Sequence, residues 1–229
     1  MTYVATIVLA FCSIVYELLL GQTLSAFLGN TVLRYSVTIG LYMFSMGIGA
    51  LFAEGKVIKN PLKSLLAVEL GLTIIGGFCV VLMFATSYLS PPGLLFSFIA
   101  HSLIIIIGIL TGFEIPLLIH VRNLEKAGSD NKVLGIDYLG AFLGTVVFAF
   151  FFYPTFGLVP TAFLIGALNG FVGLLLFIRA IKFNVGSVKH LFVAQLIVFF
   201  LVVGCLYNAR EINRYLIATY LKISTEEVT

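Results

Sequence analysis

Several stretches of this chain are apolar except for single ionisable side chains. These side chains are Glu17, Glu69, His101, Glu114 and Asp137. A charged side chain at the centre of a membrane helix costs roughly 2.5–3.5 kcal/mol on insertion scales, unless it is paired, hydrated or protonated. We therefore expect these groups to face the interior of a helix bundle, where carboxylates can form an ion or substrate site.

A proline stands close to one of the carboxylates. Pro116 follows Glu114 by two residues in the stretch GFEIPLL, Gly112–Leu118. Proline cannot donate the helical hydrogen bond to the carbonyl about one turn earlier, that of Gly112, so we expect the helix to be displaced near Glu114. A helix break beside a carboxylate is a common feature of binding sites in transporters.

The composition places these residues in an integral membrane protein. Hydrophobic residues make up 61% of the 229 residues and charged residues only 10%, whereas about 25% is usual in soluble domains. The mean hydropathy is +1.15. Seven apolar runs are long enough to cross a hydrocarbon core about 30 Å thick: Tyr3–Phe27, Val32–Ala53, Pro61–Tyr88, Leu94–His120, Val133–Tyr153, Leu158–Ala180 and Leu191–Tyr207. Continuous runs favour helices over the alternating strands of a membrane barrel.

The sequence therefore predicts an all-α polytopic membrane protein, with seven transmembrane helices in residues 1–207 and a separate tail in 208–229. Apolar residues recur near helical spacing in the tail, at Ile212, Leu216, Tyr220 and Ile223. This pattern favours an amphipathic helix in the outer interface, and a linker to a further domain is the alternative. The first run lacks a basic segment and an A-x-A cleavage site, which favours a retained helix over a signal peptide.

The distribution of basic residues predicts the orientation. Three loops on one face have basic residues in or beside them: Lys56, Lys59, Lys63, Arg122, Lys126, Lys132, Arg179, Lys182 and Lys189. The opposite face has only Arg34, Arg210, Arg214 and Lys222. The positive-inside rule then places the amino terminus in the cytoplasm and the carboxyl terminus outside. In this orientation the outer helix ends carry an aromatic belt of Tyr35, Tyr88, Tyr153 and Tyr207.

Positions along the helices predict the depth of the carboxylates. Glu69, Glu114 and Asp137 are five to eight residues from the nearest basic residue on the cytoplasmic face. At a rise of 1.5 Å per residue they lie roughly 7–12 Å inside the boundary, so we expect them to converge at one level. Glu17 lies nearer the outer side, within possible reach of Arg34.

Small and polar residues predict close helix packing. Gly47-x-Gly49, Gly140-x-x-x-Gly144 and Gly166-x-x-x-Gly170 permit close crossings, and Asn169 adds an interhelical hydrogen-bonding group. The alternative interpretation of the carboxylates is that they are neutral or hydrogen-bonded groups that fix this packing. For His101 a structural donor is favoured over a proton carrier.

Three stretches, in order, resemble a known family: Ile14–Gly55, Gly112–Leu118 and Asp137–Leu158. Together they resemble the amino-terminal membrane domain of membrane-bound spermidine synthases, the polyamine aminopropyltransferase family. The recurring YE, GFEIPL and DY positions of that family correspond here to Tyr16-Glu17, Gly112–Leu118 and Asp137-Tyr138. The resemblance implies a multi-helix membrane domain and a connection to polyamines.

In that family a soluble domain with a methyltransferase-like fold follows the membrane domain and binds decarboxylated S-adenosylmethionine. No acidic, glycine-rich nucleotide loop follows a strand within these 229 residues. The resemblance therefore implies the fold of the membrane domain. It does not imply that these residues carry out aminopropyl transfer.

Two functional classes follow. In the first, the chain binds or transports a small organic cation such as a polyamine, with Glu69, Glu114 and Asp137 at the site. Other residues are expected to contribute to binding (Glu17, Tyr16, Tyr138) or to structure and gating (Pro116, Arg34, His101, Asn169). In the second class, the chain is a membrane module that anchors, docks or regulates a separate soluble enzyme. An intramembrane enzyme with a carboxylate as general acid or base is a third interpretation, which no nucleophile and base pair supports.

The surroundings expected from the sequence are the lipid bilayer of a bacterial inner membrane. We expect no cofactor and no metal, because Cys12, Cys79 and Cys205 lie one per helix without metal-ligand spacing. Nucleic-acid binding is not expected either, since the basic loops account for the net charge of +3.

Overall fold

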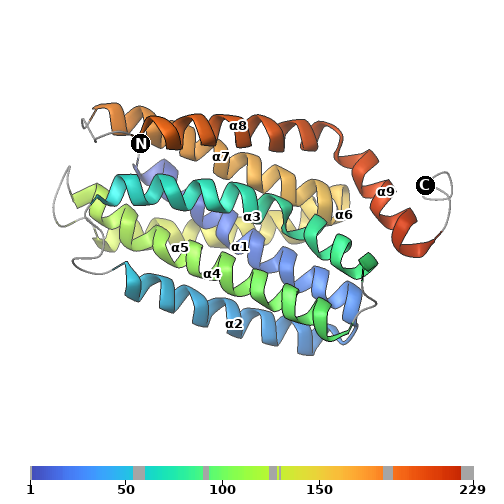
Figure 1. The fold of residues 1–229 in the computed structure, drawn as a ribbon. Coiled ribbons are helices and arrows are strands. Elements are labelled where there is room, and N and C mark those ends of the chain that lie inside the picture. The colour runs from blue at the N-terminus through green and yellow to red at the C-terminus, as the bar shows by residue number, and fades with distance from the viewer. Residues whose placement is uncertain are drawn as a thin grey trace.

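Each apolar run of the sequence forms one long helix in the computed structural model (Figure 1). The structure describes residues 2–53, 60–89, 93–123, 128, 130–182 and 188–222. The long helices are α1 (Thr2–Leu28), α2 (Thr31–Phe52), α3 (Pro61–Leu89), α4 (Leu94–Asn123), α5 (Asp130–Val147), α7 (Leu158–Lys182) and α8 (Lys189–Tyr207). The run that starts with α5 continues through a π-helical turn, η2 (Phe148–Phe152), into the short α6 (Tyr153–Phe156).

Within the described residues, seven helical segments are long and apolar enough to cross a membrane. The predicted all-α polytopic fold is therefore confirmed. The first and last described residues lie at opposite ends of the bundle (Figure 1), as an odd number of spans requires. The predicted division into a domain of residues 1–207 and a tail of 208–229 remains a prediction.

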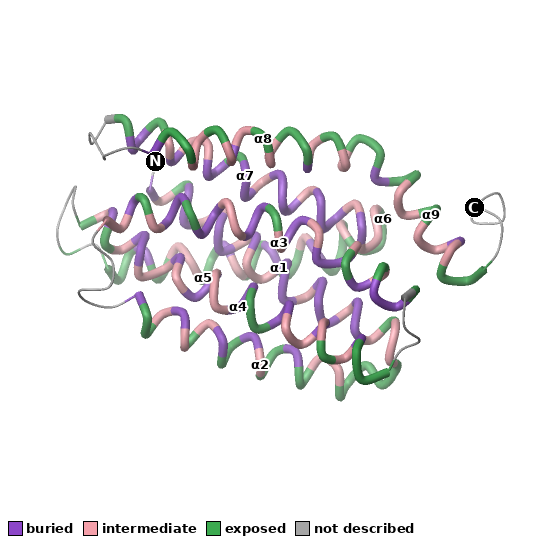
Figure 2. Tube along the Cα trace, viewed as in Figure 1, coloured by how far each residue is buried: buried purple, intermediate pink, exposed green. Residues whose placement is uncertain are grey.

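Helix α1 lies at the centre of the bundle and packs against α2, α3, α4, α5 and α7. Buried positions are concentrated on α1, α3 and α7, whereas α2, α5 and α8 are more exposed (Figure 2). The exposed positions of the outer helices are largely apolar, as lipid contact requires. Polar groups on the buried face of α1, such as Glu17 and Thr23, are therefore surrounded by other helices.

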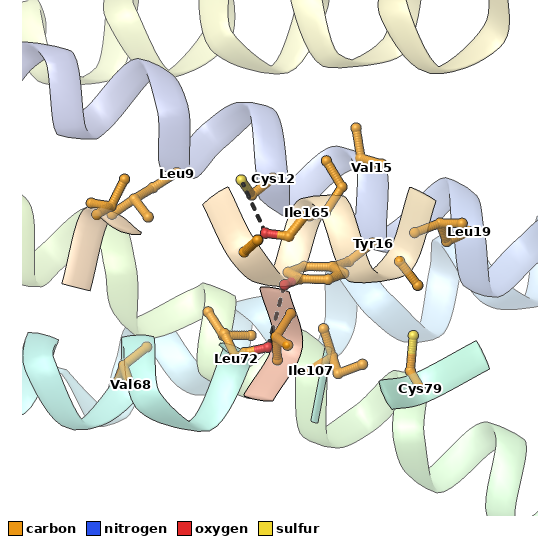
Figure 3. Close-up of a cluster of buried hydrophobic side chains, with 14 of the residues drawn as sticks. Leu9, Cys12, Val15, Tyr16, Leu19, Val68, Leu72, Cys79, Ile107 and Ile165 are labelled. Carbon is orange, nitrogen blue, oxygen red and sulfur yellow. Dashed lines mark hydrogen bonds between the residues drawn. The ribbon is translucent and has the colours of Figure 1, made fainter. Parts of the chain in front are cut away.

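The centre of the core is built around Tyr16, which is fully buried (Figure 3). Its hydroxyl donates to the backbone carbonyl of Leu72 on α3 at 3.3 Å. On the same face of α1, the thiol of Cys12 lies 4.0 Å from the carbonyl oxygen of Ile165 on α7. Tyr16 thus joins α1 to α3 as a core residue.

Glycines set the distances between the helices. A Cβ atom on Gly49 would collide with the backbone of α4 at Ile109, and a Cβ on Gly140 would collide with the carbonyl of Ile7 on α1. A Cβ on Gly166 would lie 2.7 Å from Cα of Gly77 on α3. The predicted close crossings are therefore present. Gly47 is the exception, because it faces open space.

The tail forms the predicted helix. After Asn208 the chain enters α9 (Ala209–Leu221), which lies across one end of the bundle (Figure 1) and contacts α3 and α7. The ring of Tyr220 packs edge-on against Phe27 and Phe84, with ring centroids 5.1 and 6.4 Å away. Ile223 lies outside the described residues.

Several basic residues lie at one end of the bundle. Lys63, Lys132 and Lys189 are exposed at the end where α1 begins, and the guanidinium of Arg122 lies 4.9 Å from the ring centroid of Tyr3 there. The loop residues Lys56, Lys59 and Lys126 lie outside the described residues.

Two of the tyrosines assigned to the aromatic belt are linked through Gln22 at the opposite end of the bundle. The hydroxyl of Tyr35 donates to Gln22, and Gln22 donates to the hydroxyl of Tyr153, both at 2.7 Å.

Candidate cation-binding cavity

A cavity of about 300 Å³ lies between α1, α2, α4 and α5. This volume is at the lower end of the roughly 300–1,000 Å³ typical of small-molecule sites. Its lining combines a few polar groups with methionine, isoleucine and alanine side chains: Ala10, Ser13, Ile14, Glu17, Met43, Met46, Thr111, Glu114, Ile115, Asp137, Tyr138 and Ala141.

Three carboxylates from three different helices line this cavity. Glu17 comes from α1, Glu114 from α4 and Asp137 from α5. The cavity follows α1 from Ala10 to Glu17, which is about 10 Å of helix at 1.5 Å per residue. The lining includes no lysine or arginine among the residues that the structure describes. The cavity therefore has an acidic wall without a basic partner.

Glu114 is the most deeply buried of the three, with 3% of its surface exposed. Within the described part of the chain, its Oε1 atom has no hydrogen-bond partner. Glu69 and Asp137 both lie within electrostatic range of Glu114. A buried carboxylate oxygen without a donor is costly, so Glu114 can gain stabilisation from a cationic donor that enters the cavity.

Other polar groups of the wall are already hydrogen-bonded. The carbonyl of Ser13 accepts a hydrogen bond at 3.0 Å from the hydroxyl of Tyr42 on α2, a residue that does not itself line the cavity. Thr111 donates to the carbonyls of Ile107 and Gly108, at 3.1 and 3.0 Å. The Thr111 hydroxyl therefore donates to the backbone, and the three carboxylates are the acidic groups of this wall.

Two exposed residues mark the mouth of the cavity. Met43 on α2 is 63% exposed and Tyr138 on α5 is 73% exposed, and both line the cavity. Each lies within its membrane-spanning helix, away from the helix ends. The cavity therefore reaches the outer surface of the bundle at α2 and α5.

Glu69 was predicted to join Glu114 and Asp137, but it does not line this cavity. It is fully buried and its Oε2 accepts a hydrogen bond from Asn169 on α7 at 2.9 Å. The position of a residue along a helix predicts its depth in the membrane. It does not predict which neighbouring helix the side chain faces. Glu17, which was placed further out, shares the cavity with Glu114 and Asp137 because the cavity is elongated along α1.

The remaining predicted residues have structural positions. Tyr16 is in the core, and His101 lies away from the cavity with Nδ1 hydrogen-bonded at Ser97. Among the described residues, Arg34 makes no ion pair with Glu17, and its Nε atom has no hydrogen-bond partner.

The expected break at Pro116 is absent. Helix α4 continues from Leu94 through Pro116 to Asn123. A proline removes one backbone hydrogen bond, which the surrounding turns of a packed membrane helix can tolerate. Glu114 therefore lies in a helix that Pro116 does not interrupt.

Gln195 on α8 is a polar residue that the sequence analysis did not single out. It is buried and donates to the hydroxyl of Thr73 and to the carbonyl of Gly170, both at 3.1 Å. The sequence feature that could have identified Gln195 is its amide side chain inside an apolar run, because burying a polar group in a membrane costs free energy.

Comparison with known proteins finds relatives named polyamine aminopropyltransferase. A polyamine aminopropyltransferase of Leptospira interrogans is 36% identical over 173 residues, which cover 73% of this chain and 33% of the relative. The enzyme of that name from Oceanobacillus iheyensis is 39% identical over the same lengths and shares. Polyamine aminopropyltransferase 1 of Streptomyces coelicolor is 33% identical over 189 residues, 80% of this chain and 34% of the relative.

No family model matches this chain, and no solved structure matches it. The chain spans about one third of the length of the curated relatives that it matches. This agrees with the resemblance to a membrane region that the sequence predicted. By sequence similarity, the chain corresponds to a partial region of polyamine aminopropyltransferases.

Proposed function

We propose that this protein binds a small organic cation, a polyamine in the first instance, in the cavity between α1, α2, α4 and α5. The observation that carries this proposal is the convergence of Glu17, Glu114 and Asp137 on one cavity whose described lining has no basic side chain. Transport of the bound cation across the membrane would be a further property of the same site.

The chemistry of the wall suits a flexible polyammonium chain. Carboxylates accept charge-assisted hydrogen bonds from ammonium groups, and these are stronger where solvent screening is low. In the same lining, Met43, Met46 and Ile115 offer apolar contact for methylene segments. A polyamine carries several ammonium groups, which suits a cavity lined by three carboxylates.

The names of the relatives support a polyamine as the cation. They are called polyamine aminopropyltransferases, and the matched region makes up about a third of each. A membrane region with a polyamine site would bring that class of compound to a protein that acts on polyamines.

The alternative is a membrane module that only docks a separate enzyme, with the acids fixing helix packing. In that case the carboxylates should be hydrogen-bonded to one another or to neighbours. The unpartnered Oε1 of Glu114 favours binding instead.

For the location we propose a bacterial cell membrane, with the amino terminus in the cytoplasm and the carboxyl terminus outside. The relatives named above are bacterial. The exposed lysines at the end where α1 begins fit the positive-inside rule.

Calorimetric titration of the purified protein with spermidine and putrescine tests the proposal. We expect the wild type to bind, and Glu114→Gln and Asp137→Asn each to weaken spermidine binding about ten- to hundredfold. The reason is that a hydrogen bond to a charged group is worth about 1.5–3 kcal/mol and each 1.4 kcal/mol is tenfold in affinity.

Glu211→Gln is the matched control, because Glu211 lies exposed on α9 away from the cavity. This variant should bind spermidine like the wild type. No heat of binding with the wild type, or equal affinity in Glu114→Gln and wild type, would contradict the proposal.

A further inference from the structure

A second group of buried polar side chains lies between α3, α7 and α8. We call Glu69, Thr73, Asn169 and Gln195 the polar cluster. Glu69, Thr73 and Asn169 have no exposed surface and Gln195 is 3% exposed. None of the four lines the cavity described above.

The polar cluster has more hydrogen-bond acceptors than donors. The amide group of Asn169 donates to Oε2 of Glu69, and that of Gln195 donates to the Thr73 hydroxyl. The Thr73 hydroxyl in turn donates to the backbone carbonyl of Glu69 at 2.6 Å. Three oxygens remain without a partner among the described residues: Oε1 of Glu69, Oδ1 of Asn169 and Oε1 of Gln195.

Gly173 brings these side chains together. A Cβ atom at this position would lie 3.3 Å from Cβ of Glu69 and 2.9 Å from Nε2 of Gln195. Because Gly173 has no side chain, Glu69 of α3 and Gln195 of α8 can both pack against α7 at this position. The unpartnered oxygens come from three helices that meet at this point.

The charge of the polar cluster limits what can satisfy it. Protonation of Glu69 at Oε1 would supply one donor for the two amide oxygens, so one acceptor would still lack a partner. Glu69 is the one carboxylate of the polar cluster, so a monovalent cation balances its charge. A divalent cation would also need the charge of Glu114, which lies on α4 within electrostatic range, because an uncompensated buried charge is expensive. A polyamine is too large, because Gly166 and Gly77 hold α3 and α7 in direct contact one turn away. A small monovalent cation satisfies both the limit on charge and the limit on size.

We propose that Glu69, Asn169 and Gln195 bind a small monovalent cation, with Na⁺ as the ion to test. Carboxylate and amide carbonyl oxygens are the ligands that hard cations prefer. The site is separate from the polyamine cavity and does not depend on the function proposed for that cavity.

Thermal unfolding of the detergent-purified protein in NaCl and in choline chloride of equal ionic strength tests this site. A thiol-reactive dye can follow unfolding, because Cys12 and Cys79 are fully buried and become reactive when the bundle opens. Cys205 is only partly buried, so the protein carries Cys205→Ala as background. We expect a saturable rise in Tm with Na⁺, of about 3–6 °C at ten times the Kd.

Variants assign the effect to the polar cluster. Glu69→Gln and Gln195→Met should each abolish the difference in Tm between Na⁺ and choline, whatever their Tm in choline. Glu211→Gln, an equivalent change on the exposed face of α9, should keep it. Should one cluster variant fail to fold, the other still reports on the site.

Two results would overturn the proposal. The first is a wild-type Tm that is the same in Na⁺ and choline. The second is a Na⁺-dependent rise that persists undiminished in Glu69→Gln or in Gln195→Met.

Discussion

Replacing Gly49 with alanine is expected to lower the Tm by about 2–12 °C, whereas the same change at Gly47 should leave it unchanged or raise it slightly. Overpacking of a well-packed core costs typically 1–3 kcal/mol, and 1 kcal/mol corresponds to about 2–4 °C for a chain of this size. The comparison is well matched, because both glycines belong to α2 and are two residues apart.

The difference between the two glycines comes from their neighbours. A Cβ on Gly49 would collide with the carbonyl of Ile109 and lie 3.1 Å from Cα of Gly112. Both are backbone atoms of α4, so they cannot move without separating the helices. Gly47 has no atom within 4 Å of such a Cβ. Equal Tm values for the two variants, measured with the thiol-reactive dye, would show that α2 and α4 are not in this contact.

Replacing Gly140 with alanine is expected to have a comparable effect on stability and an additional effect on the cavity. A Cβ there would collide with the carbonyl of Ile7 and lie 2.9 Å from Cβ of Ala10 on α1. Asp137 and Ala141, on either side of Gly140 in α5, line the cavity together with Ala10. Moving α5 away from α1 should therefore lower the Tm by about 2–12 °C and weaken spermidine binding at least about tenfold.

Gly135→Ala is the control for this variant. Gly135 lies in the same helix, and a Cβ on it would meet no atom within 4 Å. Its Tm and spermidine affinity, measured by the dye assay and by calorimetry, should match those of the wild type. If Gly140→Ala unfolds earlier but binds spermidine with unchanged affinity, the α1–α5 contact does not shape the site.

The sequence was sufficient to predict the membrane spans. Hydrophobic length decides whether a segment can cross a bilayer, and backbone hydrogen bonding inside a bilayer requires helices. Helix ends shifted by a few residues, as at α5, where the predicted run began at Val133 and the helix begins at Asp130. The small-residue contacts at Gly140 and Gly166 were also predicted, because backbone approach requires residues of that size.

The site could be predicted only in part. Glu69, Glu114 and Asp137 were predicted to converge because their depths agree, and of these three Glu114 and Asp137 line the cavity. Glu69 has a similar distance to its helix end, yet its partner Asn169 is 100 residues away in sequence and on a different helix. Which helices are neighbours depends on packing between distant segments, and the spacing of residues within one segment does not contain that information.

The structure also separates two polar regions that the sequence could not distinguish. One face of α1, with Ser13 and Glu17, borders the cavity. Another face, with Cys12 and Tyr16, packs against α3 and α7, the helices that hold the polar cluster. The central helix thus stands between the two proposed sites, and a change in its position would affect both.

A crystal structure of the protein with bound spermidine tests the central claim most directly. We expect spermidine in the cavity between α1, α2, α4 and α5, with ammonium nitrogens about 2.7–2.9 Å from carboxylate oxygens of Glu114 and Asp137. Spermidine bound at another position, with the cavity free of it at saturating concentration, would contradict the assignment of these carboxylates as a polyamine site.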